Sequence, residues 1–369
     1  MRKRVLAAFL SVCLAVSLLG GAALPAAAED AAGDPLARDL ALYPEARSFL
    51  VESQEDLEAM AAVVNGGKDL KGYTFLQTED ITLEGEFTPI GKNLSNASGM
   101  ANIATVFKGT YDGGCHTISN LNINLPGQNG VGLFGACYGA TLRNIGIESG
   151  SVTGANRAGG IAGYADACQV LSCYNKADIQ IVSGVDGAGG IAGVARDSAE
   201  ITGCANFGSV TAVSAGAGGI AGWGASNITL RACYSGGAVL LSGTSAGSGA
   251  TDAFGRCSAG SDRSFASCWY LQSVCESNFW GGQALAEENL PMIAYRMNDA
   301  LGTGNRNFTV DTRGDFVFMR AGRSGIDCMN LRTIRGGVML EGTPVYLPDG
   351  GYYTVPAEYG GAAVESAAA

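Results

Sequence analysis

Short apolar runs fill the middle of the chain, and Gly, Ser, Asn and Asp separate them. Most runs are three to six residues long, and between residues 131 and 242 none extends into the 3.6-residue period of a helix. Runs of this length, bounded by turn-forming residues, are typical of short β-strands joined by tight turns. The pattern therefore predicts an all-β fold.

The apolar runs repeat. The string AGGIAG occurs at 158–163, 188–193 and 217–222, and a looser copy, VGLFG, occurs at 131–135. Aligned on one glycine, the copies are 28, 30 and 29 residues apart, at Gly132, Gly160, Gly190 and Gly219. A unit this short cannot bury its own apolar face, so copies must stack. Stacking of strands about 4.8 Å apart predicts a parallel β-helix.

Stacking places equivalent residues of successive coils in columns. The first predicted inward column contains Leu133, Ile161, Ile191 and Ile220. The second contains Ile145, Cys173, Cys204 and Cys233. Strand alternation then points Gly159 and Gly163 inward and Gly160 and Ala162 outward, which leaves a nearly bare outer wall. Because stacked Cβ vectors run parallel, we expect free buried thiols, with a series of disulfides as the alternative.

A short amphipathic helix precedes the repeats. Ser53 is a candidate N-cap, Asp56 nearly completes a capping box, and Gly66 is a stop signal. The predicted buried face contains Leu57, Met60, Ala61 and Val64. Such a helix would cover the open end of the stack, where strand edges are otherwise bare.

These features divide the chain into six segments. They are a secretory signal peptide (1–28), a flexible linker (29–50), a cap helix with the first coils (51–128), repeat coils (129–282), a C-terminal capping region (283–358) and a disordered tail (359–369). The signal has a basic start at residues 2–4, an apolar stretch at 5–24 and an Ala-x-Ala site ending at Ala28. A retained membrane anchor is the alternative, and no later segment reads as membrane-spanning. We therefore expect a secreted, extracellular protein, with cell-surface association left open.

Charge and composition narrow the chemistry. The net charge is −11, and loss of the three basic signal residues gives −11 − 3 = −14, which argues against nucleic-acid binding. His116 is the only histidine and there is no Cys-x-x-Cys pair, so we expect no metal and no cofactor. Asp112 with Gly113 and Gly114 reads as turn chemistry rather than a Ca²⁺ loop. The acids of the repeats form no column, so we predict no catalytic residue and no enzyme.

Aromatic residues are the candidates for binding. Tyr164 and Trp223 both directly follow a copy of the repeat string, and Tyr174 and Tyr234 both follow a column cysteine. If these rings are exposed on a wall, they can stack on sugar faces or anchor a protein partner. If they point inward, they only fill the core, and both alternatives stay open.

The order of motifs resembles that of the GLUG-motif proteins, which are secreted or surface-attached bacterial proteins. The resemblance covers the helix segment, YTFLQTEDITL, FTPIG, FKGTYDGGCHTISNLNI, GLFG and the GGIAG units. It implies a right-handed parallel β-helix, which we expect to carry a short N-terminal capping helix and an irregular C-terminal cap. Similar repeats occur beside the catalytic part of immunoglobulin A-cleaving metallopeptidases. Those need His-Glu-x-x-His, which a chain with one histidine cannot supply.

The sequence thus favours a non-catalytic, adhesin-like binding protein that presents a β-helix wall to a glycan or a host or cell-surface protein. One alternative is a β-helix carbohydrate-active enzyme, a polysaccharide lyase or glycoside hydrolase, which would need acids converging in one groove. The other is a structural spacer in a larger surface assembly.

Overall fold

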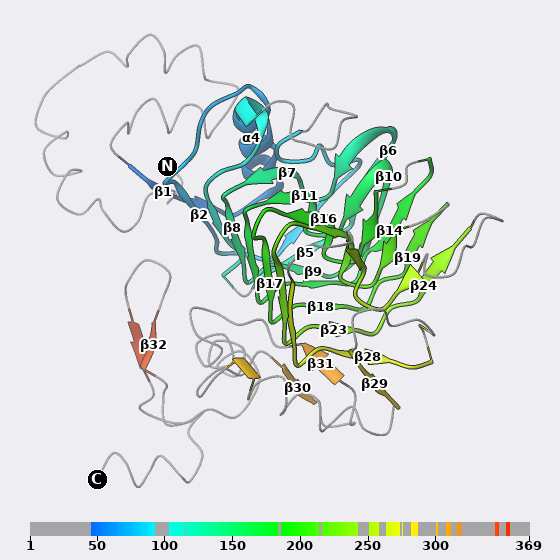
Figure 1. The fold of residues 1–369 in the computed structure, drawn as a ribbon. Helices are drawn as coiled ribbons and strands as arrows, with labels where there is room; N and C mark the ends of the chain where they lie inside the picture. Colours follow the sequence, from blue (N-terminus) through cyan, green and yellow to red (C-terminus); the bar gives the residue numbers. More distant parts are fainter. Residues whose placement is uncertain are drawn as a thin grey trace, which may run out of the picture.

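The computed structural model is a parallel β-solenoid, as the repeat predicts (Figure 1). The structure describes residues 46–92, 103–114, 116–183, 186–213, 216–242, 251–257, 263–273, 275, 282–286 and 300–301, and four short strands beyond residue 307. The predicted signal peptide and tail, and most of the predicted C-terminal capping region, lie outside these residues. Within them, no helix is both long and apolar enough to cross a membrane.

The coils build four parallel sheets, and the chain passes repeatedly from sheet D to C, A and B. Sheet A contains β1 (Ser48–Val51), β2 (Thr74–Gln77), β4 (Thr110–Asp112), β8 (Thr141–Arg143), β12 (Gln169–Leu171), β17 (Glu200–Thr202), β22 (Ile228–Arg231) and β27 (Arg263–Ala266). Sheet B contains β3 (Ile81–Thr82), β5 (Thr117–Ser119), β9 (Gly146–Ile147), β13 (Tyr174–Asn175), β18 (Ala205–Asn206), β23 (Tyr234–Ser235), β28 (Trp269–Leu271) and β29 (Gln283–Leu285).

The other two sheets meet at the AGGIAG segments. Sheet C contains β7 (Phe134–Tyr138), β11 (Ala162–Asp166), β16 (Ala192–Arg196), β21 (Ala221–Ala225) and β26 (Arg256–Cys257). Sheet D contains β6 (Leu121–Val131), β10 (Gly150–Gly159), β14 (Asp178–Ile181), β15 (Ala188–Gly189), β19 (Val210–Ala212), β20 (Ala217–Gly218), β24 (Val239–Leu241) and β25 (Thr251–Asp252). Beyond the solenoid lie the antiparallel pairs β30 (Phe308–Val310) with β31 (Phe316–Phe318), and β32 (Pro344–Tyr346) with β33 (Tyr352–Thr354).

The predicted cap helix is α4 (Gln54–Asn65), at the N-terminal end of the stack (Figure 1). All four residues of its predicted apolar face are buried in the same core as the first strands. The Asp56 carboxylate accepts hydrogen bonds from the Ser53 hydroxyl and the Glu52 N–H, both at 3.0 Å, and so closes the first turn. Strand β1 begins at Ser48, so the solenoid starts inside the segment predicted as a linker.

The column Leu133, Ile161, Ile191 and Ile220 is fully buried. The Ile161 N–H donates to the Ile191 carbonyl at 3.1 Å, and the Ile191 N–H donates to the Ile220 carbonyl at 2.9 Å. These hydrogen bonds continue the parallel ladder through the bend, which keeps the isoleucines of successive coils in register.

The prediction that Gly160 and Ala162 face outward is wrong. Strand β10 ends at Gly159 and β11 begins at Ala162, so a bend separates them and strand alternation does not carry across it. A Cβ atom on Gly160 would collide with the side chain of Asn175, which is fully buried. Ala162 is fully buried within the main core. The repeat string therefore leaves no bare outer wall.

At each bend, two strands pack backbone against backbone. A Cβ on Gly193 would lie 2.5 Å from the carbonyl carbon of Arg157, which is in sheet D. A Cβ on Gly189 would collide with the carbonyl oxygen of Ala192. Because neither backbone can move without breaking a ladder, glycine is required at these positions in every copy.

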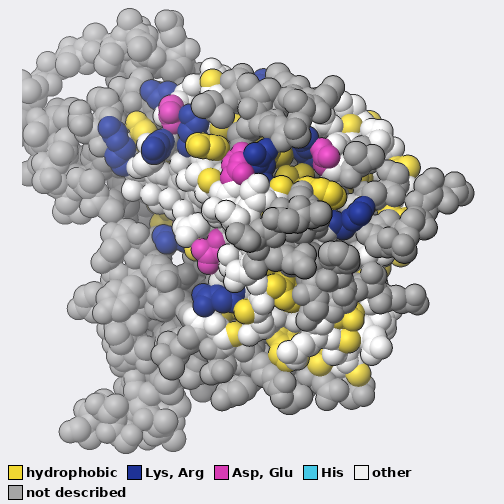
Figure 2. Space-filling view, in the orientation of Figure 1, with side chains coloured by type: hydrophobic (Ala, Val, Ile, Leu, Met, Phe, Trp, Pro, Cys, Tyr) yellow, Lys and Arg dark blue, Asp and Glu magenta, His cyan; other side chains and the backbone are white. Residues whose placement is uncertain are grey.

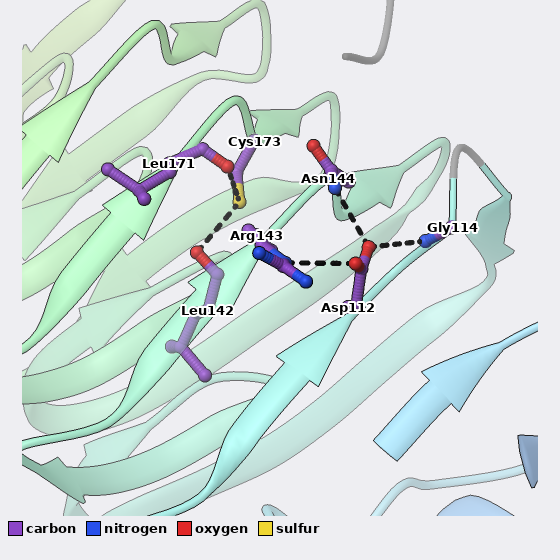
Figure 3. A network of polar contacts seen from close by, with 7 residues as sticks. All are labelled: Asp112, Gly114, Leu142, Arg143, Asn144, Leu171 and Cys173. Atoms are coloured by element: carbon purple, nitrogen blue, oxygen red, sulfur yellow. Dashed lines mark hydrogen bonds and ion pairs between the residues drawn. The ribbon is translucent and has the colours of Figure 1, made fainter. Parts of the chain in front are cut away.

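Cys173, Cys204 and Cys233 lie buried and unbridged in the core. The Cys173 thiol donates to the carbonyls of Leu171 at 3.3 Å and Leu142 at 3.7 Å (Figure 3). The other two cysteines make the same pair of contacts one and two coils further on. Burial, with the neighbouring thiol adding to it, raises the pKa of Cys204 well above its ordinary value. These thiols serve as small apolar groups that satisfy carbonyls.

Asp112 stabilises the corner between sheets A and B in an early coil (Figure 3). Its buried carboxylate accepts hydrogen bonds from the Gly114 N–H at 3.0 Å, Asn144 Nδ2 at 2.8 Å and Arg143 Nε at 2.9 Å. Asn144 has a φ of 57°, in the left-handed region that lets the chain turn the corner. Asp112 therefore performs turn chemistry, as its sequence context suggests.

We predict that Gly189→Ala lowers the free energy of unfolding by about 2–3 kcal/mol, because the added methyl group overpacks two fixed backbones. Gly127→Ala is the matched control, since a Cβ there meets nothing within 4 Å, and it should change stability by less than about 0.5 kcal/mol. Denaturant unfolding followed by circular dichroism measures both. Equal effects would contradict the backbone-packing argument.

We also predict that the seven buried cysteines that the structure describes resist thiol reagents in the native protein and that all seven react after denaturation without reductant. These are Cys137, Cys168, Cys173, Cys204, Cys233, Cys268 and Cys275. The reason is burial, which keeps the thiols protonated and inaccessible. Alkylation in guanidinium without reductant, followed by peptide mapping, reports on each of these seven separately, and any of them left unalkylated would show that it forms a disulfide.

Candidate binding surface on sheet C

The outer face of sheet C carries two adjacent columns of side chains. The first contains Val106, Ala136, Tyr164, Val194 and Trp223, which form an apolar cluster separate from the main core. The second, two residues further along each strand, contains Lys108, Tyr138, Asp166, Arg196 and Ala225. We call these ten residues the sheet C wall. Figure 2 shows basic, acidic and hydrophobic side chains side by side over the region where Figure 1 places β7, β11 and β16.

The wall brings together Tyr164 and Trp223, two of the four aromatic residues predicted to bind a ligand. They occupy one column, two coils apart, with Val194 between them. Tyr164 is 1% exposed and its ring is covered, whereas Trp223 remains partly exposed. Only Trp223 of this pair can therefore contact a ligand through its ring.

Tyr174 and Tyr234 lie elsewhere, on sheet B. They are in one column with Ala205 between them and are buried with Trp269 and Leu285 in another apolar cluster. The Tyr174 hydroxyl donates to Glu148 at 3.0 Å. Their rings fill space under neighbouring segments, so the structure gives them no ligand-facing surface and separates them from the first pair.

Tyr138 is the wall residue that the sequence selection missed. It is 44% exposed and neighbours Asp166 in the second column. The selection used the position directly after the repeat string, where Tyr164 stands. Counting two residues further, which keeps the same face of a strand, would have found it.

A polar network fixes the middle of the wall. Tyr164 Oη accepts a hydrogen bond from Arg196 Nη1 at 3.0 Å, and the Arg157 guanidinium lies 5.2 Å from the centre of the Tyr164 ring. Arg196 Nε donates to Asp197 at 2.8 Å, and Arg157 Nε donates to Asp186 at 2.8 Å. The buried tyrosine hydroxyl thus has a hydrogen-bond partner. Arg157 is held by an aspartate of the next coil, and Arg196 by the aspartate that follows it in the chain.

Asp166 lies inside this network and is 6% exposed. Burial raises its pKa to about 6, and the nearby Asp197 carboxylate contributes in the same direction. Arg196 Nε, 3.7 Å from the Asp166 carboxylate, partly opposes the shift. Burial also raises the pKa of Tyr164, so its hydroxyl stays protonated at neutral pH.

Arg256 lies next to Trp223 in register, where sheet C continues into β26. Its guanidinium carbon is 5.7 Å from the centre of the indole ring, within the range of a cation–π contact. The partly exposed end of the wall therefore combines an aromatic face with a positive charge.

In the part of the chain that the structure describes, no group of three or more His, Cys, Asp or Glu side chains is arranged to hold a metal ion. The wall offers hydrogen-bonding and stacking groups.

Comparisons with known proteins agree with the fold. No family model matches the chain, so no family is assigned. A stretch of 161 residues, 42% of the chain, is 32% identical to Halomucin of Haloquadratum walsbyi, and it spans 2% of that protein's length. A solved structure from Bacteroides ovatus, described as a "putative immunoglobulin A1 protease", is 20% identical with a TM-score of 0.56. That match covers 73% of this chain and 92% of the other, and it shows a shared β-solenoid fold alone.

We predict that Asp166 makes stability fall as pH rises from about 4 to about 7. An ordinary aspartate titrates near 3.8 and folded Asp166 near 6, so between these values the folded state holds a proton that the unfolded state has released. Relative to Asp166→Asn, the wild-type protein should lose up to about 3 kcal/mol across this range, at about 1.4 kcal/mol per pKa unit. Urea unfolding at several pH values measures the difference.

The variant Asp197→Asn provides a second test of the pH dependence assigned to Asp166. Removing the neighbouring carboxylate should lower the pKa of Asp166 and narrow the pH range of the loss. If the stabilities of the wild-type protein and of Asp166→Asn change with pH by the same amount, the assignment of the pKa shift to Asp166 is wrong.

Proposed function

We propose that this chain is a non-catalytic, adhesion-type binding module that works outside a bacterial cell, and that the sheet C wall contacts an extended glycan or a cell-surface protein. One observation carries the proposal: the exposed Tyr138 and the partly exposed Trp223 lie on the same wall, three coils apart. Coils about 4.8 Å apart separate them by roughly 14 Å along the stack. That span suits an elongated ligand lying along the solenoid axis.

The groups between the two aromatics support this function. The carboxylate of Asp197 is 40% exposed, and the Arg196 side chain is 25% exposed. Both present hydrogen-bonding edges to solvent while their mutual hydrogen bonds hold them in place. Because the network is already ordered, a ligand would bind it with little loss of side-chain entropy.

A glycan suits this surface better than a large protein interface does. The exposed apolar area consists of isolated rings among charged groups, whereas stable protein interfaces have an apolar centre shielded from water. Sugars offer an apolar ring face for Tyr138 or Trp223 and hydroxyl groups for the arginine–aspartate edges. The secretory pattern at the start of the chain supports an extracellular location.

The carboxylates of Asp166 and Asp197 give little support to the alternative of a glycoside hydrolase. Glycoside hydrolases separate their two carboxyl groups by about 5–5.5 Å or 6.5–9.5 Å, to admit the sugar or a water. Asp166 is buried, and Asp197 is ion-paired with Arg196 at 2.7 Å, so neither carboxylate is free to act as the acid or base of a hydrolase. We therefore propose binding without catalysis.

We predict that Tyr138→Ala and Trp223→Ala each weaken binding of the preferred glycan about tenfold or more without unfolding the protein, because each removes a stacking face near the surface. Glycan arrays identify the ligand, and isothermal titration calorimetry measures the affinities.

Leu240→Ala is the matched control, since Leu240 is 51% exposed but lies on sheet D, and it should leave binding unchanged. A wild-type protein that binds no mucin, cell-wall glycan, acidic polysaccharide or matrix protein would overturn the proposal and favour a structural spacer. Equal losses from all three variants would place the binding surface elsewhere.

A further inference from the structure

Arg256 lies on β26, beside the Trp223 end of the sheet C wall, and it differs from Arg157 and Arg196 in its described partners. Arg157 and Arg196 both form ion pairs with aspartates, at 2.7 Å in each case. Across the described residues, no ion pair or hydrogen bond joins the Arg256 side chain to an acid, and its guanidinium lies over the Trp223 ring. Arg256 is also partly exposed.

A guanidinium on an aromatic ring keeps its donors available. The ring attracts the cation through its face, while the N–H groups point outward in the guanidinium plane. Two parallel N–H donors match the two oxygens of a carboxylate. Trp223 is itself partly exposed beside this guanidinium, so one site can offer both an aromatic surface and a pair of donors.

We infer that Trp223 and Arg256 form a subsite for a sugar that carries a carboxylate, such as a uronic or sialic acid unit within an extended glycan. The inference rests on the proposed function, and it names the ligand class for the same wall. Trp223 stacks on the sugar ring, and Arg256 pairs with its carboxylate.

The opposite end of the wall repeats the combination. Lys108 neighbours the exposed Tyr138 in the second column. Lys108 pairs with Asp69 at 3.1 Å; its own side chain is 15% exposed and that of Asp69 is 60% exposed. Tyr138 and Trp223 thus each lie beside a cation, which suits a polymer that bears repeated carboxylates.

The cations at the two ends of the wall differ in geometry, and the difference predicts which of them contributes more to recognition of a carboxylate. The Arg256 donors match a carboxylate in a bidentate manner, whereas Lys108 offers a point charge already shared with Asp69. Replacing Arg256 should therefore reduce the preference for acidic over neutral ligands more than replacing Lys108 does.

The net charge of the chain is −11, so the chain as a whole repels acidic polymers. Any preference for them must come from these local contacts.

The test measures binding of matched ligand pairs to the full chain by calorimetry. One pair is oligogalacturonate and its methyl ester, and the other is a sialylated glycan and its desialylated form. We expect the acidic member of at least one pair to bind about tenfold tighter at low salt, with the advantage shrinking as salt screens the charges.

Arg256→Met should remove most of that advantage and leave affinity for the neutral member nearly unchanged. Arg256→Lys should restore only part of it, because the ammonium lacks the planar pair of donors. Arg231→Met is the matched control, since Arg231 is an exposed arginine on sheet A, and it should keep the full advantage.

The outcomes separate the two proposals. If acidic and neutral members bind equally, or if Arg256→Met keeps the advantage, the carboxylate subsite is wrong while glycan binding stands. If the protein binds neither member of any pair and no other glycan, both proposals fall.

Discussion

At each AGGIAG bend, the backbone of sheet D packs directly against the backbone of sheet C, with no side chain between them. A Cβ on Gly193 would lie 2.5 Å from the Arg157 carbonyl carbon, and other glycines of the motif would collide with backbone in the same way. This contact sets the turn of the coils that carry the motif, because the next strand can begin only where the glycines let the chains approach. The isoleucine that follows then enters the core, and the coils stay in register.

The interior of the bend has no space for larger side chains. The residue types of successive coils therefore differ mainly on the outer face. The outward positions of sheet C hold tyrosine, valine and tryptophan in one column and tyrosine, aspartate and arginine in the next. A ladder that repeats about every 4.8 Å lines these different side chains up along one axis. The architecture therefore converts a repetitive backbone into a linear array of distinct contacts, which is the form that an elongated ligand requires.

The middle and the ends of this array differ in kind. In the middle, the ion pairs Arg157–Asp186 and Arg196–Asp197 lie around Tyr164, and their hydrogen bonds hold these side chains in place. At the ends, Tyr138 is exposed beside Lys108, which pairs with Asp69, and Trp223 is partly exposed beside Arg256, which has no acidic partner among the described residues. Polar groups that are already ordered favour specific recognition of a ligand, and aromatic rings beside cations offer surface for contact with it. Together these features argue for a binding function.

The sequence by itself determined the solenoid, the period of its coils, the isoleucine and cysteine columns and the cap helix around Leu57 and Met60. Those features follow from apolar periodicity and turn residues, which act over short distances along the chain. It did not determine that Ala162 is buried, because a bend interrupts strand alternation there. Nor did it show that Trp223 is partly exposed whereas Tyr164, Tyr174 and Tyr234 are buried, since burial depends on what packs over each ring. Only the tertiary structure decided that Tyr138, Trp223 and Arg256 share one surface, because parallel register joins residues that lie far apart in the chain.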